Sequence, residues 1–281
     1  MKSVRRTVSD GALSLLIRTL YLTGKENGDR LCARLAETVA PVVSHPTSVG
    51  DIRILCAGET SEWRIRTLLT KEPETLDWIS GFGDDDTLWD VGANIGLYSL
   101  YAARRGVRVL AFEPSAPNYY LLNRNIALND LAGYIGAYCL AFAGKSGLDA
   151  LYMTDAQLGG ARNSFGTAVD WRGLPLVAGT TQATVGFRID EFVRGFNPRF
   201  PTHLKIDVDG LESRIVEGAA ETLADPRLRS VLIELDTARS DYCRGVESAM
   251  AAAGLRLIDR RRSPMFDGTP YASSYNHIFA R

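Results

Sequence analysis

The sequence predicts a mixed α/β fold built around a largely parallel sheet. From residue 87 onward, short apolar segments alternate with helical segments, which is the pattern of strands joined by crossover helices. A glycine-containing turn at residues 90–96 follows the first of these strands and opens a helix, as in Rossmann-like nucleotide sites. The length of 281 residues and the apolar content of 46% allow a core of this size.

Periodicity and turn signals predict one large domain preceded by an accessory segment. Residues 1–50 are expected to form an N-terminal helical extension, and residues 51–281 the α/β domain. Within that domain, residues 51–55 and 63–68 have the partial alternation of a β-hairpin. The Gly- and Thr-rich segment at about 148–190 is predicted to be an antiparallel β insertion. The remaining strands are predicted at 87–91, 108–112, 134–142, 203–208, 230–235, 255–258 and 276–280, with helices at 95–105, 116–129, 212–223 and 242–253.

Composition argues against several functional classes. The 32 basic and 33 acidic residues nearly balance, which argues against a dedicated nucleic-acid binder. No apolar run reaches membrane-spanning length, and Arg18 interrupts the apolar start, so we expect a cytoplasmic protein without a secretion signal. The four cysteines are scattered and form no C-x-x-C pair, which indicates neither a zinc site nor a redox centre.

The turn at residues 90–96 has the sequence DVGANIG, which suits a small adenosyl ligand. A dinucleotide site needs G-x-G-x-x-G, whose second glycine lets the pyrophosphate approach the backbone. Asn94 stands at that position here, while Gly92 and Gly96 still allow a tight turn. A zwitterionic ligand without phosphate, such as S-adenosylmethionine, therefore fits better than NAD.

Glu113 is the second predicted element of this site. It ends the second strand, 21 positions after Gly92, where an acidic side chain can accept hydrogen bonds from both ribose hydroxyls. Ser115 and Asn118 begin the next helix near the same ribose. A surface charge at a strand end is the alternative for Glu113.

Further segments are distinctive in combination: DVGANIGLYSLYAA, FEP, LKIDVDGLE, VLIELD and the terminal NHIFAR. Together they resemble the FkbM-type methyltransferases of the class I fold, from about residue 51 to the end. One departure is Asp209, where such enzymes commonly have Glu. The resemblance implies a seven-stranded sheet with an antiparallel last strand, S-adenosylmethionine as methyl donor, and a hydroxyl acceptor on a sugar, lipid or secondary metabolite.

The resemblance also implies donor contacts, carried over by position. Glu74 and Thr75 would approach the methionine end, although a helix-start acid is an equally good interpretation of Glu74. Asp90 and Gly92 would approach the amino acid group. The ribose would meet Glu113, and the adenine would meet Cys139, Leu140 and Ala141. The set is completed by Ala93, Asn94, Gly96, Pro114, Ser115, Asn118 and Asp207.

A hydroxyl acceptor needs a group that takes its proton. Strand alternation places Lys205, Asp207 and Asp209 on one face, with both carboxylates near the carboxyl end, where open sheets bind ligands. Glu234 ends the neighbouring strand and can join Asp207 to share a proton or hold a divalent cation. His277 is a further candidate base, because the start of an antiparallel last strand lies at the ligand face.

Structural roles are the alternatives for these catalytic candidates. Asp207 can pair with Lys205, whose ammonium would otherwise be unpaired. Asp209 and Glu212 have the spacing of a helix cap, and His277 can be a core residue. Ahead of it, the loop at 265–275 carries aromatic and small polar residues that suit a sugar or aromatic acceptor.

Three functions therefore remain open from the sequence. The one predicted is methyl transfer to a small-molecule acceptor. An NAD-dependent oxidoreductase and a non-catalytic nucleotide sensor are the alternatives, and the pattern indicates no particular oligomeric state.

Overall fold

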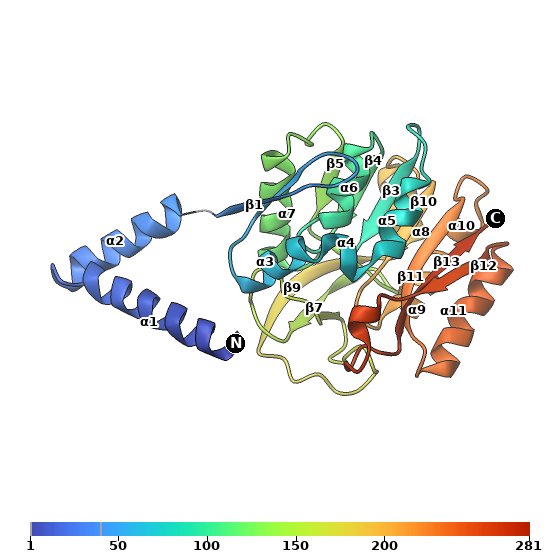
Figure 1. Cartoon of the computed structure of the whole chain (residues 1–281). Coiled ribbons are helices and arrows are strands. Elements are labelled where there is room, and N and C mark those ends of the chain that lie inside the picture. The colour runs from blue at the N-terminus through green and yellow to red at the C-terminus, as the bar shows by residue number, and fades with distance from the viewer. Residues whose placement is uncertain (1, 40) are drawn as a thin grey trace. The chain divides into compact units, whose positions relative to one another are not determined.

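A seven-stranded sheet forms the centre of the fold (Figure 1). The computed structural model describes residues 2–39 and 41–281. From edge to edge the strands are β12 (Arg256–Arg261), β13 (Ser274–Ala280), β11 (Ser230–Asp236), β10 (His203–Ile206), β3 (Thr87–Val91), β4 (Arg108–Phe112) and β5 (Ile135–Tyr138). The last strand, β13, runs antiparallel to both neighbours, whereas β11, β10, β3, β4 and β5 are parallel. The predicted Rossmann-like class I sheet is confirmed.

Helices cover both faces of this sheet, because its central strands are apolar on both sides. In β3, Leu88 belongs to one buried cluster and Trp89 to the other, as side-chain alternation requires. The helices that pack around Leu88 are α5 (Pro73–Ser80), α6 (Leu97–Arg104) and α7 (Ala116–Leu128). Those around Trp89 are α8 (Ile189–Phe196), α9 (Glu212–Glu217), α10 (Ala220–Ala224) and α11 (Ser240–Ala252).

The prediction of a β-hairpin at the start of this domain is wrong. Its first segment does form a strand, β2 (Ile52–Leu55), but the second lies in two helices, α3 (Glu59–Arg66) and α4 (Leu68–Lys71). The buried side chains of Ile65 and Leu68 are three positions apart, which is the spacing of a helical face. Short apolar segments are ambiguous between the two periods, and packing against the sheet domain decides for the helix.

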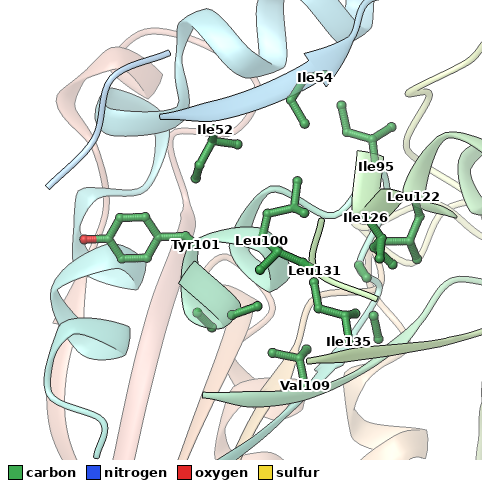
Figure 2. Close-up of a cluster of buried hydrophobic side chains, with 14 of the residues drawn as sticks. Ile52, Ile54, Ile95, Leu100, Tyr101, Val109, Leu122, Ile126, Leu131 and Ile135 are labelled. Atoms are coloured by element: carbon green, nitrogen blue, oxygen red, sulfur yellow. The ribbon is translucent and has the colours of Figure 1, made fainter. Parts of the chain in front are cut away.

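Strand β2 is held in place from two sides. It pairs with β1 (Val42–His45), and two asparagine side chains, one in the last turn of α7 and one directly after it, bond its backbone. Oδ1 of Asn129 accepts a hydrogen bond from the N–H of Arg53, and Oδ1 of Asn125 accepts one from Leu55, each at 2.9 Å. Figure 2 shows the two isoleucines of β2 pointing toward the apolar side chains of α6 and α7. Helix α3 therefore starts from an anchored strand.

A second sheet occupies the region of the expected β insertion. Its strand order is β6 (Ala141–Phe142), β9 (Thr180–Phe187), β7 (Gly147–Met153) and β8 (Ser164–Phe165). Strand β7 runs antiparallel to β8 and β9, whereas β6 pairs with β9 in parallel. The long connections of this insertion supply part of the site described below.

The chain divides into two compact units, residues 1–42 and 43–281. Within the first, the described helices are α1 (Lys2–Leu20) and α2 (Lys25–Thr38). Across the described residues, no helix combines the length and apolar character needed to span a membrane.

The turn after β3 packs directly on the chain that leaves β10. Gly92 has φ of +87°, and a Cβ added to it would lie 1.8 Å from the carbonyl oxygen of Asp207. The N–H of Asp207 donates to the carbonyl of Val91, and the N–H of Gly92 donates to that of Phe112, each at 3.0 Å. The ends of β3, β4 and β10 thus meet at one glycine.

Replacing Gly92 by Ala is expected to destabilise the protein, because both the left-handed backbone and the missing space oppose a Cβ. We expect the free energy of unfolding to fall by at least ~2 kcal/mol, measured by thermal or urea denaturation. Gly133→Ala is the control, since its added Cβ would meet nothing within 4 Å. A G92A protein as stable as the wild type would contradict the close packing.

Candidate functional site

The carboxyl ends of the central strands border a cavity of about 230 Å³. This is the edge at which open α/β sheets bind ligands. Its walls also include α3, α4, the insertion and the loop before β13. The predicted residues that line it are Gly92, Asn94, Glu113, Pro114, Asn118, Asp207, Asp209 and Glu234.

Glu113 connects the glycine turn to the end of β4. Its Oε2 accepts a hydrogen bond from the N–H of Asn94 at 2.8 Å, and its Oε1 accepts one from the N–H of Ser115 at 2.9 Å. Burial raises the pKa of Glu113 to about 7, although these two donors favour the ionised form. Each carboxylate oxygen has a further lone pair, so the group can still accept bonds from a ligand.

Asn94 ties the same turn to the β insertion. Its φ is +52°, a left-handed conformation that Asn tolerates better than most residues. Its Nδ2 donates to the carbonyl oxygen of Gly160 at 2.7 Å, and Nδ2 of Asn118 donates to the same oxygen at 3.0 Å. Oδ1 of Asn118 accepts from the N–H of Gly159 at 2.9 Å. The residues that follow, Ala161 to Asn163, line the cavity.

Asp207 is held by a buried lysine. Nζ of Lys205 lies 2.7 Å from Oδ2 of Asp207 and 5.0 Å from the ring centroid of Tyr98, and the Lys205 side chain is 1% exposed. Burial alone would raise the pKa of Asp207, but the ammonium groups of Lys205 and Lys71 lower it. Asp207 therefore remains an anion, and the pairing expected as the alternative interpretation is present.

The pKa values of Asp209 and Glu234 shift in the opposite direction to that of Asp207. Burial and the nearby charge of Asp207 raise the pKa of Asp209 above its usual range and that of Glu234 well above it. Oδ2 of Asp209 accepts a hydrogen bond from the N–H of Arg162 at 2.6 Å. Glu212 does not pair with Asp209 in a capping box, since its Oε1 accepts from the N–H of Gly210 at 2.9 Å.

The structure also bears on the divalent cation that the sequence left open at Asp207 and Glu234. Within residues 2–39 and 41–281, no group of three or more His, Cys, Asp or Glu side chains is arranged to hold a metal ion. The two carboxylates of Asp207 and Glu234 do face one cavity.

Three residues expected at the methionine and amino acid end lie away from this cavity. Asp90 is 1% exposed and accepts a hydrogen bond from Oγ of Ser99 at 2.6 Å. Glu74 is 2% exposed and accepts one from Nδ2 of Asn276 at 2.8 Å, and Thr75 is fully buried. Also outside its lining are Gly96, Ser115, Cys139, Leu140 and Ala141, whereas Ala93 lines a smaller adjoining cavity.

His277 is fully buried and does not line the cavity either. The last strand is antiparallel as expected, and its first residue, Ser274, does line the cavity. His277 lies three residues farther along, which is about 10 Å at the rise of a strand. Its imidazole is neutral because burial lowers its pKa. We therefore leave His277 out of the site.

Arg64 and Lys71 line the cavity but were not singled out from the sequence. Arg64 lies on α3, within the segment 63–68 that was predicted to be a hairpin strand, and Lys71 lies at the end of α4, just after that segment. The helical spacing of Ile65 and Leu68 was the signal that could have placed them. The other lining residues not singled out individually are Trp63, Ala161, Arg162, Asn163 and Val208.

The loop at 265–275 does contribute aromatic side chains to the cavity, as Phe266 and Tyr271 both line it. The ring of Tyr271 stacks on Trp171 of the insertion at a centroid distance of 5.0 Å. One wall of the cavity is therefore aromatic, while the carboxylates lie at the strand ends.

Known proteins resemble this chain in sequence over limited segments. Methyltransferase sdnD from Sordaria araneosa is 51% identical over 53 residues, which are 18% of this chain and 20% of that protein. Methyltransferase 1 from Beauveria bassiana is 33% identical over 63 residues, 22% of this chain and 25% of that protein. The matched segments thus span a quarter or less of these curated relatives.

A solved structure extends the likeness to the fold. The methyltransferase FkbM from Methylobacillus flagellatus KT superposes with a TM-score of 0.50 over 80% of this chain and 56% of that chain, at 15% identity. At that identity the match is evidence for a shared fold alone. The family model described as methyltransferase FkbM domain matches residues 90–257, more than half of the sequence. The chain therefore belongs to the FkbM methyltransferase family.

Proposed function

We propose that the protein is an S-adenosylmethionine-dependent methyltransferase that acts on a hydroxyl of a sugar, lipid or secondary metabolite. The observation that carries this proposal is the single cavity that joins the glycine turn and Glu113 to the carboxylates of Asp207, Asp209 and Glu234. The first part suits an adenosyl donor, and the second supplies a proton acceptor for a hydroxyl. Membership of a methyltransferase family supports the reaction class.

The residues at the turn fit this donor. Gly92 brings bare backbone to the cavity, and the buried carboxylate of Glu113 offers lone pairs to ribose hydroxyls. The side chain of Asn94 is committed to Gly160, at the position where a pyrophosphate would need open backbone. When bound, S-adenosylmethionine supplies an electrophilic methyl group on a positively charged sulfur.

Glu234 is our proposed general base. It lines the cavity near the end of β11, and burial together with the charge of Asp207 raises its pKa well above the usual value. A carboxylate with a raised pKa takes a proton more readily than one held strongly acidic. Asp207, ionised by its pairing with Lys205, keeps that charge in place. The aromatic wall formed by Phe266 and Tyr271 would cover the acceptor and exclude water.

Calorimetry with S-adenosylhomocysteine tests the donor site. Glu113→Ala is expected to weaken binding by ~1–3 kcal/mol, because hydrogen bonds to a charged group are lost. Glu26→Ala, which removes an exposed carboxylate on α2, serves as the control. Unchanged affinity in E113A would contradict the ribose assignment, and binding of NADH in place of S-adenosylhomocysteine would contradict the function.

Binding of S-adenosylhomocysteine is also expected to depend on pH. With a pKa of about 7 for the free enzyme, Glu113 must lose a proton before its carboxylate accepts the ribose hydroxyls. Affinity should therefore fall as the pH is lowered through 7 and level off above it, with proton release visible in buffers of different ionisation enthalpy. The E113A protein should lack this dependence. A wild-type affinity that is constant from acid to alkaline pH would contradict the requirement for an ionised Glu113.

Glu234→Gln tests the proposed base. Turnover is expected to fall roughly 100-fold or more, while affinity for S-adenosylhomocysteine changes little, since Glu234 lies with the acceptor carboxylates. In the wild type, turnover should be lost as the pH falls through the raised pKa of Glu234, because the base must be ionised. The measurement is mass-resolved methyl transfer to acceptors from an extract, with Glu247→Gln on α11 as control. Full turnover by E234Q would exclude this role.

A further inference from the structure

A smaller cavity adjoins the main one, between the glycine turn and helices α3 and α4. Its volume of about 40 Å³ leaves room for about three water-sized groups, the size of a carboxylate. Both cavities are lined by Arg64, Lys71, Gly92, Asn94 and Asp207. A ligand seated against Glu113 in the main cavity can therefore extend one end into the smaller cavity.

The shared wall carries charges of both signs. Nε of Arg64 donates to the carbonyl oxygen of Gly159 at 2.7 Å. In the part of the chain that the structure describes, this is the one hydrogen bond that the Arg64 side chain makes, so its two terminal nitrogens remain available. Lys71 pairs with the buried carboxylate of Glu72. Asp207 supplies the anion on the same wall.

This pattern matches an α-amino acid group, which carries one carboxylate and one ammonium. A guanidinium is the side chain best suited to a carboxylate, because its planar fork can bind both oxygens. An ammonium group requires an anion, and Asp207 remains ionised at the boundary of the two cavities. The acids first expected at this end, Asp90 and Glu74, are buried and line neither cavity.

Resting on the proposed function, we propose that Arg64, supported by Lys71, binds the α-carboxylate of the methyl donor, and that Asp207 faces the donor's ammonium group. The assignment gives Arg64 two tasks. It would bind the donor through its terminal nitrogens and the insertion through Nε, so that α3 joins the donor site to the loop at Gly159.

The test compares two ligands that differ only in the carboxylate: S-adenosylmethionine and decarboxylated S-adenosylmethionine. Wild-type protein is expected to bind the first roughly 10- to 100-fold more tightly by calorimetry, the range for a hydrogen-bonded charge. Arg64→Gln should weaken binding of S-adenosylmethionine by a similar factor and leave the decarboxylated compound nearly unchanged. The preference would then disappear in the variant.

Arg66→Gln is the matched control, because Arg66 lies on the same helix, is exposed and pairs with Glu62. It should retain the wild-type preference. If R64Q does not fold, Arg64→Lys is measured in the same way and should lower the preference several-fold, since lysine makes a single-point contact.

The outcomes are distinguishable. A wild-type protein that binds both compounds equally well would overturn the inference without any variant. An Arg64 variant that keeps the preference, or that loses both ligands to the same extent, would also overturn it, because Arg64 would then act only through the bond to Gly159. Failure of the wild type to bind either compound would contradict the proposed function itself.

Discussion

The contact between the Gly92 turn and the Asp207 backbone is the constraint on which the site depends. A side chain at Gly92 would occupy the position of the Asp207 carbonyl, so the turn and the end of β10 can touch only through bare backbone. The parallel register of β4, β3 and β10 brings Glu113 to the same point. Its carboxylate then bonds the N–H of Asn94. The glycine turn, the carboxylate of Glu113 and the backbone of Asp207 are thereby held together, which leaves little freedom for their relative positions.

The second constraint is electrostatic. Several carboxylates share one region of low polarity, and they cannot all ionise at little cost. Lys205 resolves this for Asp207: burial alone would lower the pKa of Lys205, but the carboxylates of Asp207 and Glu72 raise it, so the lysine stays charged. Glu234 lacks such a counter-ion in direct contact among the described residues, and its pKa rises. Neighbouring carboxyl groups whose pKa values differ in this way are suited to different roles in proton transfer.

The β insertion forms part of the wall of the cavity. Hydrogen bonds reach Gly159 and Gly160 from Arg64 on α3, Asn94 in the glycine turn and Asn118 on α7. Three elements of the sheet domain thus converge on two consecutive residues of one loop. That loop continues into the cavity lining through Ala161, Arg162 and Asn163.

Local sequence by itself determined the sheet, the glycine turn and the acids at the strand ends, because apolar periodicity and turn chemistry act over a few neighbouring residues. Tertiary structure decided which charges reach the cavity. Helix α3 brings Arg64 to it, whereas Asp90 and Glu74 are buried outside its lining, in contact with Ser99 and Asn276. The bond from Asn94 to Gly160 spans 66 positions. Contacts of this kind depend on the packing of whole elements, for which local periodicity carries no signal.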